Sequence, residues 1–246
     1  GPESIAANSE NLVFVVDRGG DKINIYDGNN NFSCVGAIRD PHFVDITGLE
    51  IDSNDNFYVA DQGTNKIYQL DSDGNYIRTF QYEDDGEPIL DKVETLALDE
   101  GRDRLFATSE NESRVEVFEL STGNYLGEHV GERQVGVIPQ DGRFADDVEG
   151  IETDTENNWL IMSDEDNGRF MIHDLSSPDL FDGDEDYAFI SAFGRTGSAP
   201  GEFLSADGVT VYHFGDGDGL IAVADQGNYR IQVFRISDIK SALGIE

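Results

Sequence analysis

The chain has 246 residues, enough to bury the core of one all-β domain, and its 51 acidic residues against 16 basic ones give a formal net charge of -35. This charge excludes nucleic acid and anionic membranes as expected partners, and it reflects either recruitment of cations or adaptation to high salt. No stretch has the length of a membrane helix, and the single cysteine excludes an internal disulfide. We expect Cys34 to be a small buried side chain.

Five segments along the chain share one pattern: an apolar run, then Asp or Ser, four further residues, a Lys or Arg, and an alternating strand. In chain order they are VFVVDRGGDKINIYD (13–27), FYVADQGTNKIYQLD (57–71), LFATSENESRVEVFE (105–119), LIMSDEDNGRFMIHD (160–174) and LIAVADQGNYRIQVF (220–234). We call the stretch from the acidic or hydroxyl residue to the basic residue the repeat turn. A repeat of about 40–60 residues with several strands per unit is typical of β-propellers.

The repeats divide a single domain, 1–246, into five units with approximate bounds 3–43, 44–92, 93–147, 148–206 and 207–246. The sequence of each unit predicts an inner strand, a second strand that leads into the repeat turn, a third strand of alternating apolar and polar residues, and an outer fourth strand. The predicted inner strands are 4–8, 48–52, 95–99, 150–154 and 208–212. The last unit lacks a clear outer strand and ends in a short helical tail. We therefore predict an all-β fold, a β-propeller of five four-stranded blades.

One position directly precedes each predicted inner strand, and we call it the rim position. It is occupied by Glu3, Thr47, Glu94, Glu149 and Asp207. Because the inner strands of a propeller line its axis, we expect the four carboxylates to converge, where they would repel one another unless a cation neutralises them. Several flexible oxygen ligands suit Ca²⁺, so the pattern predicts a calcium site; the alternative is that these side chains only accept hydrogen bonds from nearby amides.

The repeat turn itself is first interpreted as structural, with its Asp accepting turn amides and its basic residue pairing with that Asp or with the next blade. The residue after the Asp or Ser differs between units and is expected near the carboxylates. These residues are Arg18, Gln62, Glu110, Glu165 and Gln226. Glu110 and Glu165 would add to the acidic site, and Arg18, the one cation of the set, could hold an anionic group through two hydrogen bonds. Hydrolase signatures such as G-x-S-x-G and H-E-x-x-H are absent, and the four histidines share no repeat position.

The last unit, VADQGNYRIQVF, resembles an NHL-type repeat, and longer segments resemble the β-propeller phytases. The stretch 141–175, which opens with D-G-R and continues through V-E-G, is similar to that family's D-G-R…D-I-E-G-L segment, and SADGVTVYHF (205–214) is similar to its S-D-T-D-G-I-D-V. Earlier, VVDRGGDKINIYD (15–27) resembles its S-N-R…I-x-I-Y-A-I-D. The order of all five units agrees, so the resemblance spans the whole chain.

The phytase resemblance implies a Ca²⁺-dependent phosphohydrolase that acts on phytate or another phosphate ester. Glu94, Glu149 and Asp207 match carboxylates that bind Ca²⁺ in that family, Glu110 matches an acidic pair on the neighbouring rim, and Arg18 matches a phosphate-binding Arg. With this interpretation we expect a secreted or periplasmic monomer whose partner is a small phosphorylated molecule.

The chain departs from the family pattern at positions that contact phosphate. The family's Tyr is Thr47 here, and its Lys in the second repeat turn falls at Asp61. The family also has six blades, and its first blade has no counterpart, so the chain is either a five-bladed relative or lacks a segment. Two alternatives therefore stay open: a non-catalytic NHL-type propeller that binds a protein or glycan, and a calcium-dependent propeller lactonase.

Overall fold

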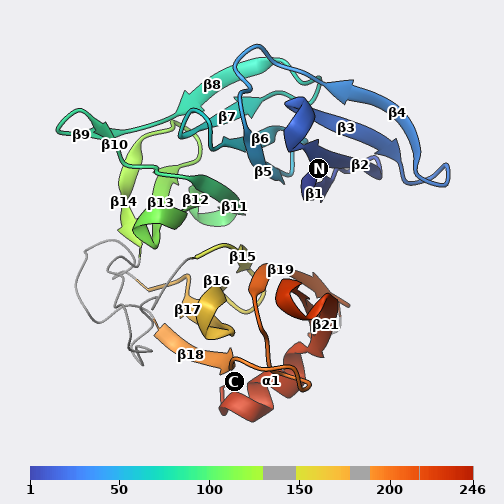
Figure 1. Cartoon of the computed structure of the whole chain (residues 1–246), viewed down its shortest axis with the longest axis vertical. Helices are drawn as coiled ribbons and strands as arrows, with labels where there is room; N and C mark the ends of the chain where they lie inside the picture. Colours follow the sequence, from blue (N-terminus) through green and yellow to red (C-terminus); the bar gives the residue numbers. More distant parts are fainter. Residues whose placement is uncertain (130–147, 178–188, 216, 246) are drawn as a thin grey trace. The chain divides into compact units, whose positions relative to one another are not determined.

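A computed structural model describes residues 1–129, 148–177, 189–215 and 217–245. Its strands form antiparallel sheets in which neighbouring strands follow one another along the chain, four sheets with four strands and one with three (Figure 1). These sheets are the five predicted blades, and the fold is that of a β-propeller. As the sequence predicts, the fifth blade has no fourth strand in the described part of the chain. No helix among these residues is long and apolar enough to cross a membrane.

The strands of the blades have the following bounds. The first blade contains β1 (Pro2–Ala7), β2 (Leu12–Asp17), β3 (Lys22–Asp27) and β4 (Ser33–Ile38). The second contains β5 (Ile46–Ile51), β6 (Phe57–Asp61), β7 (Lys66–Leu70) and β8 (Tyr76–Phe80). The third contains β11 (Val93–Asp99), β12 (Arg104–Ser109), β13 (Arg114–Glu119) and β14 (Tyr125–His129). The fourth contains β15 (Ile151–Asp154), β16 (Trp159–Asp164), β17 (Arg169–Asp174) and β18 (Phe189–Gly194). The fifth contains β19 (Ala206–His213), β20 (Gly219–Asp225) and β21 (Arg230–Arg235).

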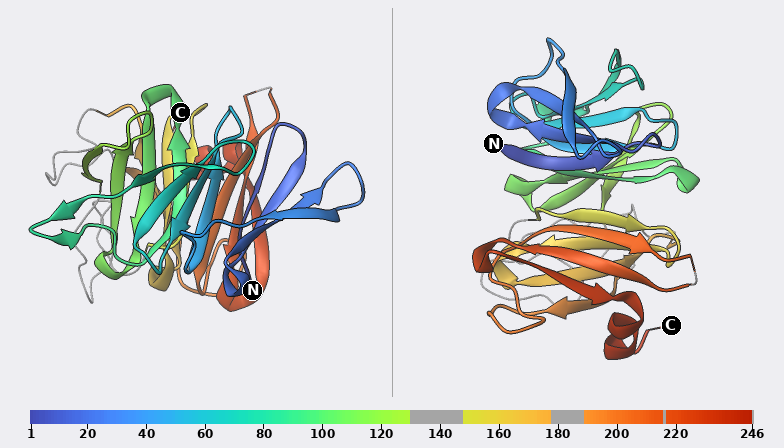
Figure 2. Two further views of the ribbon diagram at one scale, coloured as in Figure 1. Left: turned by 90° about the horizontal axis from the view of Figure 1, so that it is seen from above. Right: turned by 90° about the vertical axis from the view of Figure 1, so that its right-hand side faces the viewer.

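A few shorter elements connect or extend the blades. Short 3-10 helices are η1 (Arg18–Gly20), η2 (Glu100–Arg102), η3 (Glu110–Glu112), η4 (Glu165–Asn167) and η6 (Gln226–Asn228). The linker after the second blade forms a small hairpin of β9 (Glu83–Asp84) and β10 (Glu87–Pro88). The predicted helical tail is α1 (Ile236–Leu243), which directly follows β21 and packs on the fifth blade (Figure 2).

The chain forms two compact units, one of residues Gly1–Ser109 and Glu116–Leu126 and one of residues Glu110–Val115 and Gly127–Glu246. In the first unit, inner strand β5 lies beside both β1 and β11, and in the second unit β15 lies beside β19. Within each unit, consecutive blades therefore stand with their inner strands adjacent, which is the arrangement expected of propeller blades.

Each repeat turn ends one strand and begins the next, as predicted. In three blades the basic residue pairs with the Asp: Lys22 Nζ lies 3.4 Å from Asp17, Arg169 Nε 2.6 Å from Asp164, and Arg230 Nε 2.7 Å from Asp225. The Asp also holds the linker that enters its blade, because Val44 N donates to Asp61 over 2.8 Å and Leu204 N donates to Asp225 over 3.0 Å. The structural interpretation of this motif is therefore confirmed.

Within each compact unit, apolar side chains of one blade pack on the blade that follows it in sequence. We call the face of a blade toward its successor the forward face and the opposite face the backward face. Forward-face Phe14 and Ile23 of the first blade cluster with backward-face Leu49 and Val59 of the second. The second and third blades pair in the same way, and so do the fourth and fifth. Full burial of such side chains stabilises the fold by about 1.5–3 kcal/mol each.

In four of the five blades, the first, second, third and fifth, the rim position lies in a β-bulge that the sequence did not predict. In the first blade Pro2 pairs with Asp17 but Ile5 pairs with Val15, so β1 carries one residue more than β2 over this interval. The same shift occurs between Ile46 and Leu49, between Val93 and Leu96, and between Ala206 and Val209. Because a bulge changes the direction of the side chains within it, it controls where the rim carboxylates point.

Cys34 is exposed, so the expectation of a buried cysteine is wrong. It lies on β4, the outer strand of the first blade, on which five of six residues are exposed. The error has a physical reason. An outer strand at the edge of a sheet can have the same sequence pattern as a buried strand, but it has a neighbouring strand on one side only and so stays exposed.

Asp218 fixes the start of α1 and provides a test of pH dependence. Its carboxylate accepts hydrogen bonds from the amides of Gly219 (2.9 Å) and Ser237 (3.1 Å) and lies 3.0 Å from Arg235, and these contacts, the amide bonds first, lower its pKa to about 2. Because the folded-state pKa is below the unfolded value of about 3.9, this stabilisation is present above pH 4 and is lost as the pH falls toward 2.

We expect Asp218→Asn to unfold at a lower temperature than the parent at pH 7, with the difference shrinking between pH 4 and pH 2. Calorimetry across that range checks this, and a difference that is independent of pH would contradict it.

Candidate metal-binding site

Glu94 and Glu110 come from one blade, and the strand register places them side by side. Val93 of β11 pairs with Ser109 of β12, and each glutamate directly follows one member of that pair. Glu94 lies in the β11 bulge and Glu110 is the first residue of η3. Glu149 lies two residues before β15 and belongs, with Glu110, to the second compact unit.

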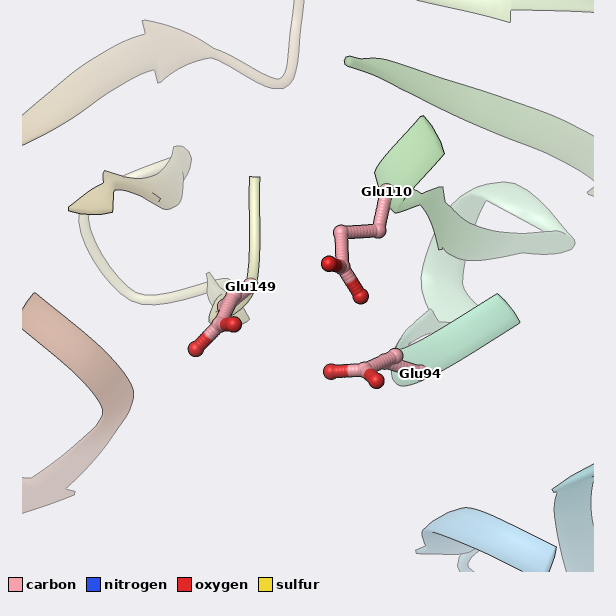
Figure 3. A group of neighbouring side chains, drawn as sticks. All are labelled: Glu94, Glu110 and Glu149. Atoms are coloured by element: carbon pink, nitrogen blue, oxygen red, sulfur yellow. The ribbon is translucent and has the colours of Figure 1, made fainter. Parts of the chain in front are cut away.

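The carboxylates of these three residues approach one another closely (Figure 3). One oxygen of Glu110 lies within 4.8 Å of an oxygen of Glu94 in the same blade, and within 4.8 Å of an oxygen of Glu149 in the same compact unit. Glu110 is buried, and the other two are half-buried. Two oxygens on one Ca²⁺, each about 2.3–2.6 Å from the ion, are up to about 5 Å apart, so this spacing fits shared coordination. Three like charges at this distance also favour a bound cation over an empty site.

Polar neighbours within the first compact unit orient Glu94. Gln62 Nε2 donates to its carboxylate over 3.3 Å, and Lys92 Nζ lies 3.7 Å from the same oxygen. Thr47, the rim residue of the preceding blade, is buried and donates to the carbonyl of Val93 over 2.9 Å. The rim position of the second blade thus supports the backbone next to Glu94, and its hydroxyl is directed at that carbonyl.

Arg18 contacts acidic and amide side chains. Its Nε and one terminal nitrogen donate to Asp45 over 2.6 Å and 2.9 Å, the same terminal nitrogen contacts Gln62, and Glu3 lies 4.0 Å from the other terminal nitrogen. The hydrogen bonds to Asp45 raise the pKa of Arg18. The guanidinium therefore links the first and second blades, and an anionic ligand at Arg18 would compete with Asp45.

Asp207 is not a member of the group of three glutamates found among the described residues. It accepts a hydrogen bond from Gln226 Nε2 over 3.2 Å, within the fifth blade. The structure therefore brings together Glu94, Glu110 and Glu149 of the predicted metal ligands and leaves Asp207 outside that group.

Two glycines that the sequence interpretation did not single out position the rim residues. A Cβ on Gly48 would lie 2.3 Å from the carbonyl oxygen of Glu94, and a Cβ on Gly150 would lie 2.1 Å from that of Asp207. Glycine at these positions lets the backbone of the next inner strand approach closely. A signal was present in the sequence, since Gly follows the rim position in three of the five units, at Gly48, Gly150 and Gly208.

Several segments of the sequence interpretation cannot be compared with the structure. The linker 131–147, with the D-G-R segment that carries part of the phytase resemblance, lies outside the described residues. The acidic loop 182–189 does so except for its last residue, and the Gly/Asp run 215–219 does so at position 216.

Comparisons with known proteins identify the fold. No protein-family model matches the chain, and no curated protein matches it. Among solved structures, the chain is similar to catalytically inactive H270A virginiamycin B lyase from Staphylococcus aureus with quinupristin, with a TM-score of 0.60, 12% identity, and coverage of 95% of this chain and 69% of the other. The chain is also similar to the selenomethionine-substituted form of that lyase, with a TM-score of 0.60, 13% identity, and coverage of 94% of this chain and 68% of the other. At such low identity the likeness shows a propeller fold, and the phytase-like family stays a prediction.

Proposed function

We propose that this chain is a calcium-dependent propeller hydrolase that acts on a phosphate ester such as phytate. The observation that carries the proposal is the convergence of Glu94, Glu110 and Glu149, whose oxygens lie within 4.8 Å of one another. Carboxylates are the hard ligands that Ca²⁺ prefers, and the donor set contains no sulfur or imidazole that would favour a softer metal.

The charge of the protein explains why a metal is needed for such a substrate. With a net charge of -35, the chain would repel a phosphate ester over most of its surface. A bound Ca²⁺ supplies positive charge that attracts phosphoryl oxygens and stabilises the charge that develops on them during hydrolysis. The protein's own part is to hold Glu94 and Glu110 in place through the β11 bulge, η3 and the contacts of Glu94 with Gln62 and Lys92.

A second candidate function is a non-catalytic propeller that binds a protein or glycan partner. It is favoured by Arg18, because the guanidinium that the resemblance assigns to phosphate is hydrogen-bonded to Asp45 over 2.6 Å and 2.9 Å. No described residue selects the lactonase alternative over these two.

The decisive assay is release of inorganic phosphate from phytate and from p-nitrophenyl phosphate, with added Ca²⁺ and again after EGTA. The hydrolase proposal predicts release that EGTA abolishes and that Ca²⁺ restores. Quinupristin is tested in parallel because a solved neighbour was crystallised with it. Absence of release from both esters, with or without Ca²⁺, would refute the hydrolase, and Ca²⁺ binding without turnover would support the binding propeller.

A further inference from the structure

Lys92 lies beside Glu94, one of the three glutamates of the candidate metal site. Lysine is rare in this acidic chain, which has four lysines against 51 acidic residues. Two of the other lysines, Lys22 and Lys66, are the basic residues of repeat turns, and Lys240 lies on α1. The Nζ atom of Lys92 lies 3.7 Å from Oε1 of Glu94. One of the few ammonium groups of the protein is thus placed next to a predicted metal ligand.

Contacts from two blades fix the backbone of Lys92 in an unfavourable conformation. Its φ is +58°, in the left-handed region that favours glycine and asparagine. The amide of Lys92 donates to Oδ1 of Asn65, in the repeat turn of the second blade, over 3.0 Å. The preceding residue, Asp91, is held by Ser109 of the third blade, whose hydroxyl accepts from its amide over 2.9 Å and donates to its carbonyl over 3.1 Å. A long side chain kept in such a conformation marks a candidate functional position.

The ammonium of Lys92 is a counter-charge for Glu94. A separation of 3.7 Å is within the range of an ion pair but beyond that of a hydrogen bond, so the two groups attract each other without a fixed hydrogen bond between these atoms. Both side chains are half-buried, and both residues belong to the first compact unit. Three glutamates still outnumber this one ammonium, so the site keeps its preference for a cation.

The part of Lys92 changes when Glu94 serves as a metal ligand. The carboxylate charge is then shared with a divalent cation, and the ammonium beside it is repelled by that cation. An anion in contact with both positive charges offsets this repulsion. A lysine ammonium has three donors on a flexible stem and binds phosphate as a point charge. A phosphoryl group is therefore the kind of ligand that this arrangement favours.

Arg18 is less suited to bind the same phosphoryl group. Glu94 is among the groups that raise its pKa, so this guanidinium also lies near the site. Two of its nitrogens, however, donate to Asp45 over 2.6 Å and 2.9 Å. A phosphate at Arg18 has to displace these hydrogen bonds, whereas a phosphate at Lys92 replaces a charge contact that metal binding has already weakened.

We propose that Lys92 is a substrate-binding residue, whose ammonium contacts a phosphoryl oxygen of the phosphate ester when Glu94 holds Ca²⁺. The inference rests on the proposed hydrolase function and deepens it, because it names a side chain that recognises the substrate. Lys92 is not among the site residues that the sequence predicts.

Replacing Lys92 with Gln separates substrate binding from a structural role. Glutamine is also unbranched at Cβ, so the left-handed backbone is disturbed little. We expect the variant to bind Ca²⁺ about threefold or more tightly, because a positive charge beside Glu94 is removed. At saturating Ca²⁺ it should bind phenylphosphonate, a non-hydrolysable mimic of a phosphate ester, about tenfold or more weakly. A residue that only positions Glu94 would instead weaken both affinities when replaced. Isothermal titration calorimetry measures both.

Two further variants control for charge and folding. Lys92→Arg keeps the charge and should bind phenylphosphonate within about threefold of the parent. Lys240→Gln removes the same charge from α1, where the ammonium lies 5.3 Å from the centre of the Trp159 ring, and should leave both affinities unchanged. Circular dichroism checks that each variant is folded.

The outcomes distinguish this inference from the proposed function. A parent that binds no phenylphosphonate at saturating Ca²⁺, or a Lys92→Gln variant that binds it like the parent, would overturn the role of Lys92. Calcium-dependent release of phosphate together with such unchanged binding would leave the hydrolase standing without that role. Binding that depends on Lys92 without any release of phosphate would uphold the role and refute the hydrolysis.

Discussion

Replacing Glu149 with Gln is expected to weaken Ca²⁺ binding at least about tenfold and to lower calcium-dependent turnover accordingly. The substitution keeps the shape of the side chain but removes one of three charges, and calcium affinity depends on the number of charged ligands. In the absence of metal, the same substitution is expected to raise the stability of the fold. The three carboxylates lie within 4.8 Å of one another, and the neutral side chain no longer repels the other two.

Thermal unfolding with EGTA and with saturating Ca²⁺ separates these two effects. The parent should gain stability on Ca²⁺ addition, because a ligand that binds only the folded state stabilises it. Glu149→Gln should start from an equal or higher melting temperature in EGTA and gain less. Glu10→Gln, which removes one charge from an exposed position before β2, is the matched control and should behave like the parent. A Glu149→Gln protein with an unchanged Ca²⁺ shift would contradict the assignment of this ligand.

The blades could be predicted because their signal is local. Each repeat turn is flanked by strands with a period of two, and the constant offset from Asp or Ser to Lys or Arg fixes the hairpin. Asp164 and Arg169, five residues apart, end β16 and begin β17 as this offset requires. The outer strands were predicted from the same alternation of apolar and polar residues. The last unit has no such alternating segment after its third strand, so no fourth strand was predicted there.

The site was predicted only in part because side-chain direction depends on register. The rim position could be aligned from the sequence, but the bulge that surrounds it is a property of strand pairing. Glu94 and Glu110 were expected near each other, and the pairing of Val93 with Ser109 explains why they are. The partners of Arg18 and Asp207 could not be inferred, since Asp45 and Gln226 are in contact with them only in the folded chain.

Replacing Gly150 with Ala is expected to destabilise the protein by about 1–3 kcal/mol or more, the range for overpacking a site that cannot relax. The new Cβ would lie 2.1 Å from the carbonyl oxygen of Asp207. That oxygen belongs to backbone, so it cannot rotate away as a side chain could, and β15 and β19 must separate. Because Gly150 directly follows Glu149, the same displacement should also weaken Ca²⁺ binding.

Gly208→Ala is the matched control, because Gly208 occupies the equivalent position and its nearest neighbour is Cβ of Ala224 at 3.8 Å. This substitution should be neutral or stabilise the fold by up to about 1 kcal/mol through the lower entropy of the unfolded chain. Urea unfolding of both variants checks the difference. Equal stability of the two would mean that the close approach at Gly150 relaxes easily, whereas a large difference would show that glycine after the rim position sets the spacing of the inner strands and the placement of the carboxylates beside it.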